Sequence, residues 1–148
     1  MLEIKIRAAN FNTDLLDIIM LDRYINGERL ASDIRNEYKK YPGTIFVAEI
    51  EGEAVGYISF SPHHWNHIAM IDHLAVKENY RRQGVGSQLI QNVIQKATQK
   101  LHRILAVQTA LWNYDGMQFY KSNGFVVRAI LPGYLGPNND MIWMDKDL

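Results

Sequence analysis

The organisation of the chain follows from one stretch, Asp72-His73-Leu74-Ala75-Val76-Lys77-Glu78-Asn79-Tyr80-Arg81-Arg82-Gln83-Gly84-Val85-Gly86-Ser87. It begins inside an apolar run, residues 68–76, which we interpret as a strand that is apolar on both faces. Apolar residues then recur with a helical period and predict a long amphipathic helix that begins at the two glycines. They are Val85, Leu89, Ile90, Val93, Ile94 and Ala97. Since residues 104–109 are again typical of a strand, we expect a right-handed parallel crossover with its helix packed on the sheet.

The other strands come from alternating or continuous apolar runs on either side of this unit. They are expected over residues 2–8, 44–50, 54–60, 125–130 and 141–146. The turn Glu51-Gly52-Glu53 joins two of them as an antiparallel hairpin. We therefore predict an α/β (α+β) fold: one mixed, mostly antiparallel sheet of about seven strands with a single parallel crossover.

About four helices are expected in all. Asn12 or Thr13 can cap the first, which carries Leu15, Ile18 and Ile19 on one face. The second has the apolar stripe Leu30, Ile34 and Tyr38 and ends at Pro42-Gly43. After the crossover, Asn113 is expected to cap a short helix that runs to about Ser122 and ends at Gly124.

Length and composition exclude several classes of protein. With 148 residues and no linker-like segment, the chain is expected to form a single domain, residues 1–148. Sixteen Lys and Arg balance sixteen Asp and Glu, so there is no net charge to hold nucleic acid or an anionic membrane. No apolar run is long enough for a membrane span, and a cytoplasmic location is expected. The absence of cysteine excludes disulfides, thiolate metal sites and a cysteine nucleophile.

The glycine turn is the first candidate site. A glycine in a helical turn costs about 1 kcal/mol relative to alanine, so Gly84 and Gly86 suggest that a ligand approaches the backbone closely. The free N–H groups of a helix start and the positive end of its dipole suit a pyrophosphate, and Arg81 and Arg82 add charge. An ordinary tight turn with two exposed arginines is the alternative. Neither a P-loop nor a dinucleotide fingerprint is present, since Leu89 stands where the latter needs its third glycine.

Two separated motifs resemble those of the GNAT superfamily of N-acetyltransferases. The first is Gln/Arg-x-x-Gly-x-Gly/Ala, which Arg81, Gly84 and Gly86 match on the strand-to-helix turn. The second is an Asn followed by Phe-Tyr-x-x-x-Gly-Phe, which is similar to Asn113 and the run Phe119–Phe125. The predicted order of elements also resembles that family over nearly the whole chain. One departure is Gly116, where relatives usually carry alanine, and we expect it only to loosen the short helix.

The resemblance implies acetyl-CoA as co-substrate and an amine as acceptor, with no metal. The residues implied to bind the cofactor lie on the first strand of the crossover, on the glycine turn and on the short helix. They are Leu74, Ala75, Val76, Arg81, Arg82, Gln83, Gly84, Val85, Gly86, Ser87, Asn113 and Tyr120. Leu74 and Val76 would pair with the pantetheine arm, and a backbone N–H there could polarise the thioester carbonyl.

Tyr120 is the expected general acid, because the resemblance places it near the thioester sulfur and a phenol can protonate a leaving thiolate. The alternative is that Phe119 and Tyr120 are core aromatics, as we expect for Phe119. Asp72 is the expected base, and His73 on the opposite face of the strand, Glu49 or a water relay are alternatives. Without a cysteine to carry an acyl group, we predict a sequential mechanism with direct attack by the amine.

His63, His64 and His67 lie in one loop between two strands, which invites a zinc site. Pro62 argues against the helix that would align them, so we expect no metal there and a solvated or acceptor-facing loop.

The acceptor amine is left open by the sequence. The segment 131–140 is similar to the tyrosine-bearing loop of protein N-terminal acetyltransferases, although its turn residues also suit a plain hairpin loop. A protein N-terminal acetyltransferase is therefore one alternative, and a non-catalytic acyl-CoA-binding module is another. Dimers are common among relatives, so a homodimer is a further possibility.

Overall fold

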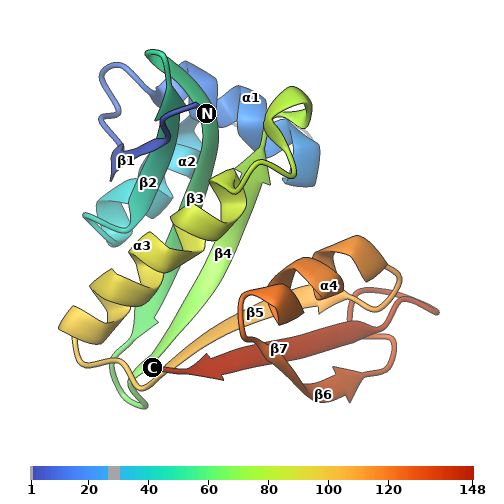
Figure 1. The fold of residues 1–148 in the computed structure, drawn as a ribbon. Coiled ribbons are helices and arrows are strands. Elements are labelled where there is room, and N and C mark those ends of the chain that lie inside the picture. Colours follow the sequence, from blue (N-terminus) through green and yellow to red (C-terminus); the bar gives the residue numbers. More distant parts are fainter. Residues whose placement is uncertain (1, 27–30) are drawn as a thin grey trace. The chain divides into compact units, whose positions relative to one another are not determined.

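The computed structural model describes residues 2–26 and 31–148 (Figure 1). Within these ranges it contains seven strands, four α-helices and one short 3-10 helix. In chain order these elements are β1 (Lys5–Ala8), α1 (Leu15–Asn26), α2 (Ala31–Lys40), β2 (Ile45–Ile50), β3 (Glu53–His63), β4 (Ile68–Val76), η1 (Glu78–Tyr80), α3 (Val85–Gln99), β5 (Ile104–Ala110), α4 (Tyr114–Ser122), β6 (Val126–Leu131) and β7 (Met141–Asp147).

The seven strands form one mixed sheet in the order β1-β2-β3-β4-β5-β7-β6. The pairs β1–β2, β2–β3, β5–β7 and β6–β7 are antiparallel. β4 and β5 are parallel, and their ladder runs from the pair Ile68/Ile104 to the pair Ile71/Val107. The predicted mixed sheet with one parallel crossover through α3 is therefore confirmed.

The observed elements differ from the expected ones near the start of the chain and at the end of β3, which runs to His63 and not to residue 60. β1 begins at Lys5 rather than at residue 2. Asp14 directly precedes α1, and its carbonyl accepts the first helical bond from the Ile18 N–H at 2.9 Å. The predicted cap at Asn12 or Thr13 was thus wrong, since both lie in the preceding turn. Of the stripe expected on α2, Ile34 is buried and Tyr38 packs on the core, while Leu30 lies outside the described residues.

The residues group into two compact units, and the first comprises Met1–Ser61 and Asp72–Val93. One of its apolar clusters joins α1 and α2 to strands β2, β3 and β4. Its members are Ala9, Leu15, Ile18, Leu21, Ile34, Ile45, Val47, Ala54, Tyr57 and Ala75. A Cβ added at Gly56 would stand 3.0 Å from the Ala75 carbonyl oxygen and 3.3 Å from Val85 Cγ1. The missing side chain at Gly56 therefore allows the start of α3 to lie against β3.

The second unit comprises Pro62–Ile71 and Ile94–Leu148. Strands β5 and β7 supply most of its buried apolar residues, with Phe125 beside them. They are Leu105, Ala106, Val107, Phe125, Met141, Ile142 and Met144. β6 differs from both, since all six of its residues are exposed. The expectation of a single domain over residues 1–148 stays a prediction.

Candidate active site

The connection from β4 to α3 leaves the start of α3 open. Gly84 has φ +87°, in the left-handed region that favours glycine, and Arg82 has φ +60°. The Gln88 N–H donates to the Gly84 carbonyl at 3.0 Å, which is the first helical bond of α3. The N–H groups of Val85, Gly86 and Ser87 therefore precede the helical ladder. The first turn of α3 also carries no acidic residue. This helix start has the donors and the dipole to bind an anion.

Side chains of the turn itself hold its shape. Arg81 Nε donates to the Val76 carbonyl at 3.0 Å, and Gln83 Nε2 donates to the Asn79 carbonyl at 2.9 Å. Arg81, Arg82 and Gln83 are all exposed. A guanidinium has five N–H donors, so Arg81 can brace the turn and still offer charge to a ligand. The sequence predicted only the charge, and the bracing role is an addition from the structure.

β4 continues for five residues after its last pair with β5. Ala75 is buried in the core, while Leu74 and Val76 are half-buried. Of the backbone groups expected to face the pantetheine arm, the Val76 carbonyl already accepts from Arg81. The pairing of Leu74 and Val76 with a ligand stays a prediction.

Asp72 and His73 are engaged by different parts of the first unit. The Ser61 hydroxyl donates to Asp72 Oδ1 at 3.1 Å, and Asp72 is exposed. His73 Nε2 lies 3.4 Å from Glu37 Oε2 on α2. The contact with α2 fits the expected orientation of His73, away from Asp72.

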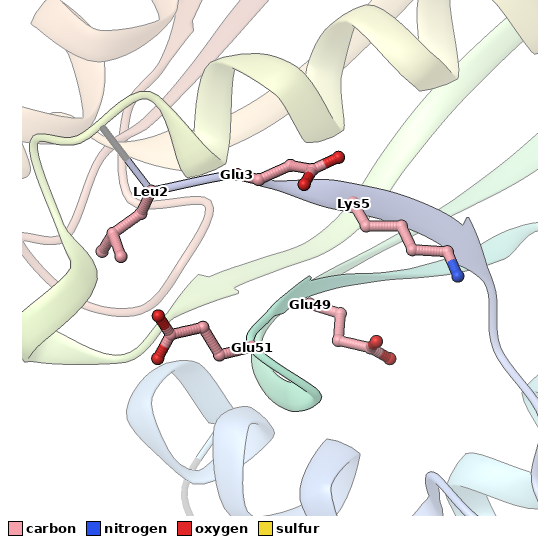
Figure 2. A pocket seen from close by; sticks show the side chains of 5 residues that line it. All are labelled: Leu2, Glu3, Lys5, Glu49 and Glu51. Carbon is pink, nitrogen blue, oxygen red and sulfur yellow. The ribbon is translucent and has the colours of Figure 1, made fainter.

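Glu49 belongs to an ion-pair network at the start of α1. Arg7 Nε donates to Glu49 Oε2 at 2.8 Å, and the other guanidinium nitrogens donate to both oxygens of Asp14 at 2.7 and 2.9 Å. The bond from Arg7 is the main reason that the pKa of Asp14 is lowered. Glu49 also lines a hollow of about 370 Å³ (Figure 2). Its other lining residues are Leu2, Glu3, Lys5 and Glu51.

In the second unit, Asn113 caps α4 as predicted. Its Oδ1 accepts the Gly116 N–H at 3.1 Å, and its Nδ2 donates to Thr109 Oγ1 at 3.2 Å. A Cβ at Gly116 would stand 2.4 Å from Asn113 Nδ2. We had expected Gly116 only to loosen the helix. The structure shows that it also makes room for the capping side chain.

Tyr120 lies on α4 between two aromatic rings. The ring centroids of Phe119 and Phe125 are 5.3 and 5.5 Å from that of Tyr120, both in edge-on geometry. Burial raises the pKa of the Tyr120 phenol, so the group keeps its proton throughout the neutral range. Phe119 is only half-buried, so it is not the core residue that we expected.

The three histidines do not all lie in one loop as expected, because His63 is the last residue of β3 and only His64 and His67 lie in the turn before β4. His63, His64 and His67 are exposed, and Trp65 is 84% exposed. The His64 ring lies 6.0 Å from that of the buried His102. Among residues 2–26 and 31–148, no three His, Asp or Glu side chains are grouped so that they could hold a metal ion. None of the helices in these ranges is both long and apolar enough to cross a membrane.

Comparison of the sequence with known protein families identifies one that matches most of the chain. The model of the acetyltransferase (GNAT) family matches residues 12–125. An N-alpha-acetyltransferase of Sulfurisphaera tokodaii is 30% identical, over 99% of this chain and 94% of its own length. Two other curated relatives match over 42% and 49% of their length, so the chain spans about half of those proteins.

Two solved structures share the fold over nearly the whole chain. Ard1 from Thermoplasma volcanium has a TM-score of 0.88 at 24% identity, with 98% of this chain and 97% of that chain covered. The NatC complex bound to Gag peptide and CoA contains a chain with a TM-score of 0.85 at 19% identity, with 99% of each chain covered. Both motifs of the sequence, on the α3 start and on α4, fall within the matched residues. The chain belongs to the GNAT family of acetyltransferases.

Proposed function

We propose that this chain transfers the acetyl group of acetyl-CoA directly to a primary amine in a ternary complex. The observation that carries the proposal is the open start of α3, where three main-chain N–H groups precede the helical ladder beside a left-handed glycine. Such a start suits the diphosphate of CoA. The family supports the same co-substrate, as does the CoA bound in the structurally similar NatC complex.

We assign the cofactor contacts to three groups of residues. The strand end would pair with the pantetheine arm, the turn would bind the diphosphate, and α4 would contribute from its start and from Tyr120. The residues are Leu74, Ala75, Val76, Arg81, Arg82, Gln83, Gly84, Val85, Gly86, Ser87, Asn113 and Tyr120. Since one Nδ2 hydrogen of Asn113 is used by Thr109, the second is the one we assign to the cofactor.

In the proposed reaction the acceptor nitrogen attacks the thioester carbonyl, the new C–N bond forms, and the C–S bond breaks. Tyr120 donates its proton to the leaving thiolate. The amine proton passes to Asp72, directly or through water. His73 and Glu49, which contact Glu37 and Arg7, remain the alternative bases.

We propose a protein or peptide N-terminal α-amine as the acceptor. The specific support is the match over almost the full length of the Sulfurisphaera tokodaii N-alpha-acetyltransferase. The chemistry agrees, because an α-amine with a pKa of about 8 is neutral in roughly one molecule in ten at pH 7, against about one in 2,500 for lysine. A weak base such as an Asp carboxylate is then sufficient, because a larger share of the acceptor is already in its neutral form. A small-molecule amine is the second candidate.

The test follows CoA release with a thiol reagent, which the cysteine-free chain does not disturb. We expect release with peptides that have a free N-terminus, and none with the same peptides blocked at the N-terminus and carrying an internal lysine. Intersecting initial-velocity lines are expected for a sequential mechanism, and parallel lines would contradict it. Acetyl-CoA binding by calorimetry without turnover on any amine would instead favour the acyl-CoA-binding module.

A further inference from the structure

Two turns of the second unit lie side by side where β4 and β5 begin (Figure 1). They are the turn of residues 64–67 and the connection of residues 100–103 from α3 to β5, and together we call them the tip surface. Arg103 joins them, since its Nε donates to the Asn66 carbonyl at 3.0 Å and its N–H donates to the His67 carbonyl at 2.8 Å. The first turn precedes β4, whereas the glycine turn follows it, so the tip surface is separate in the chain from the proposed cofactor site.

Leu101 is an unusual residue for its position at the end of α3. It has φ +63°, and the His102 N–H donates to the Ala97 carbonyl at 3.0 Å. A helix that ends in this way usually has glycine at the left-handed position, because a side chain there costs free energy. Leu101 is 80% exposed, so burial within the chain does not offset this cost. Any apolar contact that offsets it must come from outside the chain.

The tip surface has a second exposed apolar side chain and several basic ones. Trp65 is 84% exposed. His64, His67, Lys100 and Arg103 are exposed as well, and they are distributed over both turns. Two protruding apolar side chains, one on each turn, are thus set among groups that carry or can take up positive charge.

The segments that form the tip surface contain no acidic residue. Residues 62–71 and 94–104 hold three Lys and Arg and no Asp or Glu. Asp147 reaches this end of the sheet on β7, but its Oδ1 lies 4.0 Å from Arg128 Nη2. The balanced charge of the whole chain predicted no attraction to an anionic membrane. That balance does not hold for these two segments, which are locally basic.

We propose that the tip surface binds the anionic surface of a lipid bilayer, independently of acetyl transfer. Trp65 and Leu101 enter the interfacial region, and the basic side chains contact lipid phosphates. A protein partner is less suited, because a stable interface buries about 800 Å² on each side around a closely packed apolar core. RNA could contact the basic groups and stack on Trp65, but it offers no apolar layer for Leu101.

Co-sedimentation of the full chain with vesicles tests the proposal. We expect binding to vesicles of equal parts phosphatidylcholine and phosphatidylglycerol, and none to vesicles of phosphatidylcholine alone. Trp65→Ser should lower the affinity roughly tenfold, because it removes a large buried apolar side chain from the complex. Lys100→Gln should lower it about fivefold, because one attractive charge is lost. Trp112→Ser, at a tryptophan that is 75% exposed outside the tip surface, is the matched control and should leave binding unchanged.

Leu101→Gly distinguishes this role from a contribution to folding. Glycine relieves the left-handed strain, so the variant should unfold at a higher urea concentration than the wild type. Its affinity for the mixed vesicles should nevertheless fall about fivefold. A wild-type chain that does not bind the mixed vesicles, or unchanged affinity in both Trp65→Ser and Leu101→Gly, would overturn the proposal. Binding to an oligouridylate but not to the mixed vesicles would assign the tip surface to RNA and would also overturn it.

Discussion

Helices α3 and α4 both follow a strand, yet they begin in opposite ways. The start of α4 is closed by its own side chains, since Asn113 accepts the Gly116 N–H and Asp115 stands in the first turn. The start of α3 has glycine in the capping position and no carboxylate in its first turn. A helix that satisfies its own first N–H groups has little to offer an anion. The contrast assigns anion binding to α3 and leaves α4 to supply side chains.

Of the substitutions that distinguish the roles of the two helices, one on α4 is expected to have the largest effect, a loss of turnover. Tyr120→Phe removes the proton donor but keeps the ring between Phe119 and Phe125. Because loss of a positioned acid lowers a rate by about 100-fold or more, kcat should fall by that factor. Acetyl-CoA affinity, measured by calorimetry, should stay nearly unchanged. A fall in affinity with kcat preserved would show that α4 serves binding and not chemistry.

A smaller effect is expected at the open start of α3. At φ +87° a side chain is strained, and Gly84→Val should cost about 1–2 kcal/mol in the conformation that presents the N–H groups. Acetyl-CoA affinity should therefore fall by about five- to thirtyfold. Gly52→Val is the matched control, since Gly52 has φ +80° and equally open space around its Cβ position. Equal losses of affinity in both variants would show a general loss of stability and contradict a role for the turn.

Substitutions at the closed start of α4 should lower the free energy of unfolding and should have little effect on binding of the diphosphate. Asn113→Ala removes the cap and the bond to Thr109, and such losses cost about 1 kcal/mol. Gly116→Ala should have a similar effect, because the new methyl group would displace the Asn113 amide. Urea unfolding gives the free energy for both variants. If Asn113→Ala weakened acetyl-CoA binding as strongly as Gly84→Val, the contrast between the two helix starts would fail.

The parts of this contrast that the sequence could predict are local. The bounds of β4 and the start of α3 agree with the prediction, because an apolar run and a glycine pair are signals within a few residues of each other. The cap at Asn113 was equally local. The contact of Ser61 with Asp72 depends on which strands the fold brings together, and single residues carry no sign of that.

Other features were missed for a different reason. Gly56 in the middle of β3 was a readable signal of close approach, which we did not use. Asp14 took the position before α1 because Arg7 binds its carboxylate across seven residues, which local capping preference does not include. The exposure of β6 could not be predicted either, because an apolar run indicates a strand but not whether another element covers it.

The smallest effect is expected at the other end of α3. The His102 N–H donates to the Ala97 carbonyl at 3.0 Å and closes the helix, while the residue is only 4% exposed. Burial, followed by the nearby His64, lowers the pKa of the imidazole, although the His67 backbone opposes the shift. The unfolded chain, with a pKa of about 6.5, thus binds this proton more readily than the folded one. The free energy of unfolding should keep its full value above this pH and decrease as the pH falls below it.

Urea unfolding at several pH values tests this expectation. The free energy of unfolding should depend less on pH in His102→Leu, and its pH dependence should be unchanged in the control His63→Gln, at an exposed histidine. If the pH dependence were unchanged in His102→Leu, the packing at this end of α3 would not depend on a neutral imidazole.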